Sequence, residues 1–269
     1  MQDFSTINVF GLRMHILQIP HVVAAVDKWI TSRDHGNYIA VCNAYDAAYS
    51  RQDVGVQIAA NAGSLTVPDG ISMVLLARLY GYPLKKRVYG PDLMLEIIQY
   101  GLERGWKHFF YGTTEKTLSM LMIELTKRYP GLQVAGTFAP PFRPLTPQED
   151  AAVVKRINDS GADIVWVGLG TPKQQMWMYE HRDRMKVPVM LGVGAAFDFF
   201  AGTKRQAPRW IRDNGFEWLF RLLTEPRRLW KRYFVYGSLF VWYVCGQLLR
   251  DFVLKRFVRD WRNRDYRSL

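Results

Sequence analysis

The chain has 269 residues, of which 49% are hydrophobic and 22% charged, and its net charge at pH 7 is +12. This composition is typical of a globular protein and excludes a disordered or collagen-like chain. Cys42 and Cys245 lie far apart and outside any CxxC pattern, so neither a disulfide framework nor a zinc site is indicated. A reducing cytoplasm fits this cysteine usage, and the N-terminus lacks the basic and apolar regions of a signal peptide.

Short apolar runs alternate with helical stretches through most of the chain. Strands are predicted at residues 37–42, 65–67, 107–111, 132–138, 163–168 and 188–193. Helices are predicted at residues 22–32, 71–80, 114–129, 147–160 and 172–185. This alternation predicts βαβ units, and therefore a Rossmann-like α/β fold with a largely parallel sheet flanked by helices.

Helix starts are marked by residues that can cap them. Thr113 or Thr114 can cap the helix that Pro130 and Gly131 end. Thr146 and Glu149 form a capping-box pattern with Pro147 at the first helical position. Thr171 to Gln174 repeats this pattern, which predicts Gln174 as the reciprocal partner of a Thr171 cap.

The charge distribution divides the chain in two. We predict an α/β catalytic body over residues 1–200 and a basic, aromatic, helical appendage over residues 201–269. Residues 221–269 hold 12 Lys and Arg against four acids, and within them Tyr233 to Leu249 is uncharged. This 17-residue run is short for a membrane span and predicts an interfacial helix on an anionic membrane surface. The alternative is a helix packed on its own domain or on a sister subunit.

Loops that follow predicted strands carry the polar groups of a candidate site. Ligands in open α/β sheets bind beyond the carboxyl ends of the strands. Asn43 and Asp69 occupy such loops, although Asp69 in Pro-Asp-Gly also fits a simple turn. Two further loops, 168–174 and 192–198, are glycine-rich, and the first offers backbone N–H groups to a phosphate. Gly192-x-Gly194 is weak support for NAD because it lacks the third glycine, and no P-loop motif occurs.

No Asp-x-Asp motif occurs in the chain, so the usual carboxylate pair that holds a nucleotide-sugar's metal is missing. Arginines could neutralise a diphosphate instead. Helical spacing predicts that Arg221, Arg228 and Arg232 lie near one face, with Arg227 and Lys231 nearby. The alternative for this run is a solvated or lipid-facing basic stripe. The five histidines show no metal-ligand spacing.

Several motifs occur in order along the chain. They are Pro68-Asp69-Gly70, Val167-Gly168-Leu169-Gly170-Thr171-Pro172-Lys173-Gln174, Gly192-Val193-Gly194-Ala195-Ala196-Phe197-Asp198-Phe199, Ala207-Pro208-Arg209-Trp210, Glu217-Trp218-Leu219 and Glu225-Pro226-Arg227-Arg228-Leu229-Trp230-Lys231-Arg232-Tyr233. This ordered set resembles the WecG/TagA/CpsF glycosyltransferases, glycosyltransferase family 26, and the resemblance covers roughly residues 8–235.

The resemblance implies a GT-E-type fold and a peripheral enzyme on the cytoplasmic face of the bacterial inner membrane. Such an enzyme transfers a sugar from a UDP-sugar to a polyprenyl-diphosphate-linked saccharide, with inversion and without a metal or other cofactor. The product serves exopolysaccharide or cell-envelope polysaccharide synthesis. A homo-oligomer is possible, and the donor sugar, the acceptor and the linkage are not specified.

The resemblance also implies residue roles. Asp69 matches the general base, and Asn43, Arg87 and Gln174 match the sugar-nucleotide pocket, to which Gly168, Gly170, Thr171 and Gly194 contribute backbone groups. Arg221 and Arg228, with Lys231 or Arg232, match cations that close over the diphosphate. Two departures fall near the donor site: Val41-Cys42-Asn43 lacks the hydroxyl of Thr-x-Asn, and Lys173-Gln174-Gln175 replaces Lys-Gln-Glu.

Two other function classes stay open on sequence grounds. A basic, aromatic tail could bind RNA, although no aromatic RNA-recognition motif is present and we expect no nucleic-acid partner. A nicotinamide-dependent oxidoreductase is the weaker alternative, because the dinucleotide fingerprint is incomplete.

Overall fold

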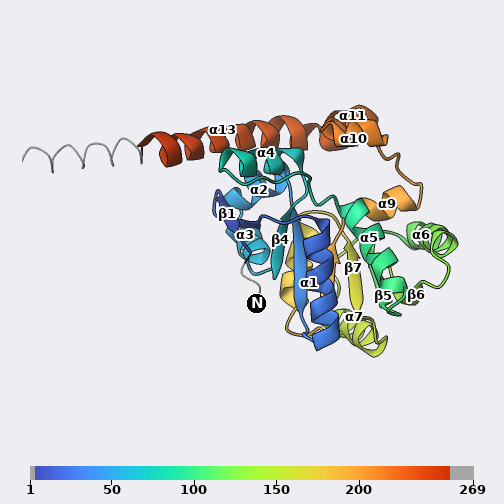
Figure 1. Cartoon of the computed structure of the whole chain (residues 1–269). Coiled ribbons are helices and arrows are strands. Elements are labelled where there is room, and N and C mark those ends of the chain that lie inside the picture. Colours follow the sequence, from blue (N-terminus) through green and yellow to red (C-terminus); the bar gives the residue numbers. More distant parts are fainter. Residues whose placement is uncertain (1–3, 255–269) are drawn as a thin grey trace, which may run out of the picture.

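A six-stranded parallel sheet forms the centre of the computed structural model, which describes residues 4–254 (Figure 1). Its strands lie in the order β4-β3-β8-β7-β5-β6. Their bounds are β3 (Asn37–Cys42), β4 (Leu65–Pro68), β5 (Lys107–Gly112), β6 (Gln133–Phe138), β7 (Ile164–Gly168) and β8 (Val189–Gly192). The predicted α/β class and all six predicted strands are confirmed, each strand to within one residue at either end.

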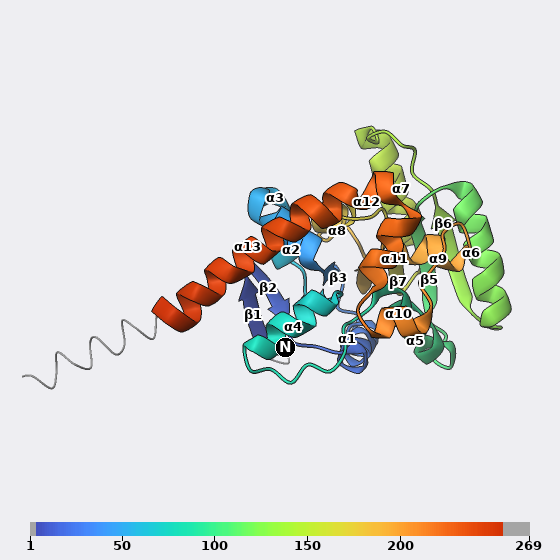
Figure 2. The same ribbon diagram turned by 90° about the horizontal axis from the view of Figure 1, so that it is seen from above.

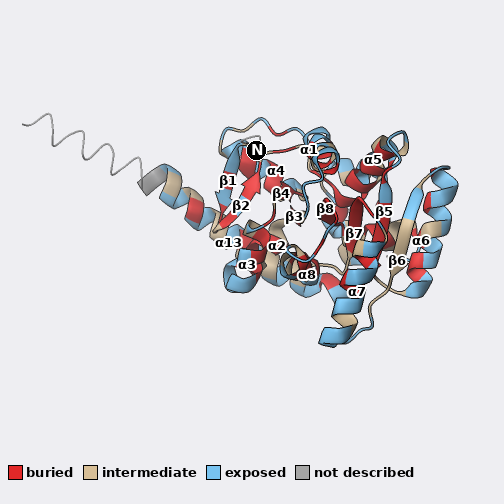
Figure 3. Cartoon of the chain, turned by 90° about the horizontal axis from the view of Figure 1, so that it is seen from below, coloured by how far each residue is buried: buried red, intermediate tan, exposed pale blue. Residues whose placement is uncertain are grey.

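Helices cover both faces of the sheet, because alternate strand residues point to opposite sides. On one face, Phe110 and Trp166 pack against α1 (Ile19–Ser32), α5 (Gly90–Leu102), α6 (Glu115–Arg128) and α9 (Ala196–Phe200). On the other, Phe109 and Val165 pack against α7 (Pro147–Asp159) and α8 (Lys173–His181). Burial is therefore concentrated in the inner strands of the sheet, whereas the edge strand β6 is exposed or half-buried, as Figure 3 shows.

A third apolar cluster lies beside the sheet. It joins the hairpin β1 (Thr6–Val9) and β2 (Leu12–His15) to α2 (Ala44–Gln52), α4 (Ile71–Leu79) and α13 (Tyr236–Leu248), with α3 (Val54–Asn61) at its edge. Phe240 of α13 is buried there, and its ring meets Phe10 edge-on at 5.6 Å between centroids. The C-terminal helix is thus part of the core of the α/β body.

The predicted helices are present, with shifted ends. Helix α1 starts at Ile19, three residues earlier than predicted, and α8 ends at His181, four residues earlier. Thr114 caps α6, accepting from the Thr117 N–H at 3.2 Å, and the Thr146–Glu149 capping box of α7 is confirmed. The hairpin and helices α2, α3 and α5 were not predicted.

Residues 201–254 continue as a chain of short helices that lies across one end of the sheet (Figures 1 and 2). These are α10 (Arg209–Asp213), α11 (Glu217–Thr224), α12 (Pro226–Trp230), the π-helical turn Lys231–Val235, α13 and the π-helical turn Leu249–Leu254. Arg221 lies in α11, Arg228 in α12 and Arg232 in the π-helical turn, because the helix breaks at Glu225 before Pro226. The helical spacing on which their predicted common face rested is therefore interrupted between Arg221 and Arg228. Within residues 4–254, no helix is both long and apolar enough to cross a bilayer.

Candidate active site

A cavity of about 580 Å³ opens where the carboxyl ends of β3, β4, β7 and β8 meet the C-terminal helices. Eleven of the twelve predicted site residues line it: Asn43, Asp69, Arg87, Gly168, Gly170, Thr171, Gln174, Gly194, Arg221, Arg228 and Arg232. Lys231 is exposed and does not line the cavity. The fold thus brings together residues as far apart in the sequence as Asn43 and Arg232. The chemical roles of these residues stay predictions.

Asp69 sits in the loop between β4 and α4. Its backbone N–H donates to the Cys42 carbonyl at 2.8 Å, which ties this loop to the end of β3. Its Oδ1 accepts from the Gly90 N–H at 3.3 Å. Burial raises the pKa of the Asp69 carboxyl to about 7; Arg87 opposes this rise, and Glu217 and Asp46 add to it. The carboxyl therefore changes protonation near neutral pH, which suits a general base.

Arg87 is held beside Asp69 by a buried acid that the sequence analysis missed. One guanidinium nitrogen of Arg87 donates to the Asp69 carbonyl at 3.3 Å, and another pairs with Glu217. Glu217 also accepts from the Tyr89 hydroxyl at 3.0 Å, and the Arg87 guanidinium lies over the Tyr89 ring at 4.1 Å. Because Glu217 starts α11, this cluster fastens the C-terminal segment to the wall of the cavity.

Three arginines approach the cavity from the C-terminal segment. Arg228 is paired with Glu225, with both nitrogen–oxygen distances at 2.6 Å. Arg221 and Arg232 form no ion pair within residues 4–254. The Nε of Arg221 is buried without a hydrogen-bond partner, and the Arg232 guanidinium lies over the Tyr45 ring at 4.6 Å. Both guanidinium groups can therefore bind an anion in the cavity.

The glycine-rich loop between β7 and α8 differs in detail from its prediction. Thr171 does not cap α8; the chain enters the helix through Pro172, and the Thr171 hydroxyl accepts from the Gln175 amide at 3.3 Å. Gln174 is buried against Gly192, and its Oε1 has no partner within the described residues. The predicted capping box is wrong, which leaves the Gln174 amide oxygen without a structural role.

Glycine is required sterically at this end of the sheet. A Cβ at Gly168 would lie 2.5 Å from the Phe197 ring. Gly170 and Gly194 have φ of +75° and +51°, in the left-handed region that favours glycine. These glycines let the β7–α8 turn and the β8–α9 turn lie close together under the cavity.

Asn43 has a structural role at the start of α2. Its Oδ1 accepts from the N–H groups of Tyr45 and Asp46 at 3.0 and 3.3 Å, and its own N–H donates to Asp46 at 3.0 Å. The sequence analysis missed Asp46, whose other oxygen is buried without a hydrogen-bond partner in the described structure. Burial raises the pKa of the Asp46 carboxyl, against the nearby Arg232. The Asn-x-x-Asp spacing was the available signal for this capping box.

A sequence model of the glycosyl transferase WecG/TagA/CpsF family matches residues 7–252. Three relatives carry the name N-acetylglucosaminyldiphosphoundecaprenol N-acetyl-beta-D-mannosaminyltransferase. The chain is 26% identical to the protein of Bacillus spizizenii over 80% of this chain and 81% of the relative. It is 29% identical to that of Bacillus subtilis over 64% and 65% of the two chains, and 32% identical to that of Staphylococcus aureus over 63% and 65%.

Within residues 4–254 no group of three or more His, Cys, Asp or Glu side chains is placed to hold a metal ion. The cations that line the cavity are those of Arg87, Lys204 and the three C-terminal arginines, and Lys204 is paired with Asp198 at 2.6 Å. This site therefore joins a carboxyl of raised pKa to two arginines without ion pairs. With these features and the family match over residues 7–252, the chain belongs to the WecG/TagA/CpsF family of glycosyl transferases.

Proposed function

We propose that the protein transfers a sugar from a UDP-sugar to a polyprenyl-diphosphate-linked saccharide, with inversion and without a metal ion. The names of the relatives support the acceptor class, because each names a diphosphoundecaprenol-linked sugar. The product would enter exopolysaccharide or cell-envelope polysaccharide synthesis. The enzyme would work as a peripheral protein on the cytoplasmic face of the inner membrane, where such acceptors are used.

One observation carries the proposal: Asp69, with a pKa of about 7, lines the same cavity as Arg221 and Arg232, which have no carboxylate partners in the described chain. A transfer with inversion needs a base at the attacking hydroxyl and a stabilised leaving group on the opposite side of the sugar. The β4–α4 loop supplies the base, and the C-terminal segment supplies the cations.

The reaction step is an in-line displacement. The Asp69 carboxylate takes the proton of an acceptor hydroxyl as that oxygen bonds to the anomeric carbon. The bond between this carbon and the diphosphate oxygen breaks, and UDP leaves with the electron pair. Arg221, Arg228 and Arg232 would bind the diphosphate, with backbone donors of the Gly168 to Thr171 turn. Asn43, Arg87, Gln174 and Gly194 would line the donor subsite.

The test is UDP release with a polyprenyl-linked acceptor. Asp69→Asn keeps the side-chain oxygen that accepts from Gly90, and it should lower turnover by about 10²- to 10⁴-fold with folding intact. Asp198→Asn is a matched control at another acid of the cavity wall, and it should retain far more activity. Near-normal turnover of Asp69→Asn would remove Asp69 from the role of base. Full activity in EDTA is expected, and a loss that Mg²⁺ restores would refute metal independence.

A further inference from the structure

Exposed apolar side chains gather around the mouth of the cavity. Among the described residues, 21 large hydrophobic side chains are exposed, and 15 of them belong to α4 or to residues 210–252. These elements lie together along one side of the molecule, as Figures 1 and 2 show. The cavity opens among them, since Ile71, Trp218 and Val241 line it and are themselves exposed. Such a concentration marks an interaction surface.

Helix α4 contributes to this surface although it belongs to the body of the protein. Its inner face is buried, and its outer face carries Ile71, Leu75 and Leu79 at intervals of four residues. Leu75 and Leu79 are 50% and 59% exposed. Arg78 is the one charged side chain of the helix, and it donates to the carbonyls of Leu84 and Lys85. A helix that faced only water would carry polar residues at these positions.

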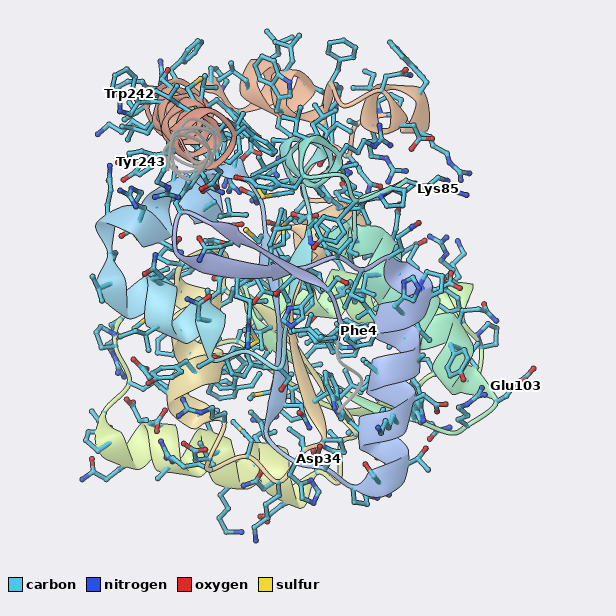
Figure 4. The ribbon with its side chains drawn as sticks, turned by 60° about the vertical axis from the view of Figure 1, so that its left-hand side comes forward. Phe4, Asp34, Lys85, Glu103, Trp242 and Tyr243 are labelled. Carbon is cyan, nitrogen blue, oxygen red and sulfur yellow. The ribbon has the colours of Figure 1, made fainter. Side chains whose placement is uncertain are left out.

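Helix α13 shares the third apolar cluster with α4 and presents a similar apolar surface. Its buried side is fixed by Phe240 and by Gln247, which hydrogen bonds the hairpin and Tyr80. On the opposite side Trp242 is 74% exposed, and Figure 4 shows it pointing away from the body while Tyr243 points toward it. No charged residue occurs from Tyr233 to Leu249. The two helices therefore expose one apolar area.

We propose that helix α4 contacts the phospholipid bilayer together with the C-terminal helices, so that the mouth of the cavity faces the membrane. Basic side chains border this area: Lys85 and Lys86, which follow α4, are exposed and form no ion pair within residues 4–254, which matches anionic head groups, whereas Arg250, which follows α13, is paired with Asp251. Acids in the same region are paired, Glu225 with Arg228 and Asp213 with Arg209. The proposal rests on the proposed function in one respect: a lipid-linked acceptor would then enter directly from the bilayer.

The test compares two double substitutions in the full chain. Leu75→Glu with Leu79→Glu places two acids on the outer face of α4. Val54→Glu with Ile58→Glu makes the same charge change at the same spacing on α3, where these side chains are 67% and 49% exposed. Helix α3 lies away from α4 and α13 along the side of the molecule (Figure 1). Co-flotation with vesicles of phosphatidylcholine and phosphatidylglycerol, and with phosphatidylcholine alone, measures binding.

The α4 variant should bind mixed vesicles at least about tenfold more weakly than the parent, whereas the α3 variant should bind as the parent does. Equal binding of both variants, or equal loss in both, would overturn the proposal.

Light scattering gives a second readout: if the α4 variant loses a dimer but keeps its vesicle binding, the surface joins two copies of the chain. Turnover on a water-soluble acceptor analogue should be unchanged in both variants. If the parent shows no such turnover, the proposed transferase activity is refuted, while the vesicle-binding result still decides the membrane contact.

Discussion

Asp69 is placed where its charge is unfavourable for folding and, in the proposed reaction, useful for catalysis. Burial acts against its ionised form, and Glu217 and Asp46 add negative charge nearby, so that Arg87 compensates only in part. The same carboxyl on the protein surface would have a pKa near 4 and would be a weak base. A base that works at neutral pH therefore lowers the stability of the folded state, by an amount that grows as the pH rises from about 4 to about 7.

This conflict gives a prediction for the pH dependence of stability. The folded-state pKa of Asp69 is about 7, above the ordinary value of 3.8, so the folded state binds more protons than the unfolded state between these values. The unfolding free energy should fall as pH rises from 4 to 7, by up to about 4 kcal/mol from this group, and then level off. Asp69→Asn has no such charge, so its Tm should exceed the parent's by a margin that grows from pH 5 to pH 8.

The quantity to measure is the difference in Tm between Asp69→Asn and the parent at each pH, because the other titrating groups contribute equally to both proteins. Thermal unfolding followed by circular dichroism at several pH values gives it. A Tm difference that stays constant from pH 5 to pH 8 would show that Asp69 has an ordinary pKa in the folded protein.

At the scale of residues, sequence alone identified the polar groups that follow strands. It missed contacts between residues that are far apart in the sequence. Asp69 belongs to the Pro68-Asp69-Gly70 motif, Arg87 was matched through the family resemblance, and the carboxyl ends of parallel strands must meet. Glu217 was noted within a motif, but its pairing with Arg87, 130 residues away, depends on how α11 crosses the sheet. Asp46 had the local Asn-x-x-Asp signal, whereas its partnerless buried oxygen could be found only in three dimensions.

Helix α13 is fastened to the body at its far end by one amide. The Gln247 Oε1 accepts from the Phe10 N–H at 3.0 Å, and its Nε2 donates to the Asn8 carbonyl and the Tyr80 hydroxyl, both at 2.7 Å. The Tyr80 hydroxyl in turn donates to Asp251 at 2.8 Å. The hairpin, α4 and α13 are therefore joined through a buried side chain that uses both its oxygen and its nitrogen.

Gln247→Ala should lower the unfolding free energy by about 1–3 kcal/mol, because it leaves the buried Phe10 N–H without its partner and removes the bonds to the Asn8 carbonyl and the Tyr80 hydroxyl. Ser238→Ala is the control on the same helix: its exposed hydroxyl bonds only the Phe234 carbonyl within the helix. Urea unfolding measures the free energy, and hydrogen exchange of the α13 amides reports whether the loss is local. Equal stability of the two variants would show that α13 is held by its apolar contacts alone.

At the scale of elements, the strands were predictable because each is a short apolar run between turn residues. Helix α5 could have been predicted as well, since Pro91 opens it and Leu93, Met94, Ile97 and Ile98 repeat at helical spacing. The hairpin was harder, because Phe10 has a positive φ of 57° that its residue type does not favour. The π-helical turns at 231–235 and 249–254 have no sequence signal that we recognise.

For the whole molecule, α13 confirms one of the two interpretations that the sequence left open, packing on its own domain, while the interfacial helix stays a prediction. One side of the helix packs on its own domain, and the other side is exposed, apolar and uncharged. The predicted boundary between the α/β body and the C-terminal appendage falls at residue 200, where α9 ends, and it stays a prediction. The segment that follows contributes to the third apolar cluster. The three arginines of the cavity and the exposed apolar face of α13 are thus positioned by the same packing.

Two neighbouring residues can separate these roles. Phe240 is 7% exposed and packs on Phe10, so Phe240→Ala should lower the unfolding free energy by about 3–5 kcal/mol. Trp242 is 74% exposed on the opposite side, so Trp242→Ala should leave Tm nearly unchanged and weaken vesicle binding instead. Thermal unfolding and vesicle co-flotation, both on the full chain, give the two readouts. If Trp242→Ala lowered Tm as much as Phe240→Ala does, then the outer face of α13 would be packed against protein in solution, and a second copy of the chain would replace the bilayer as its partner.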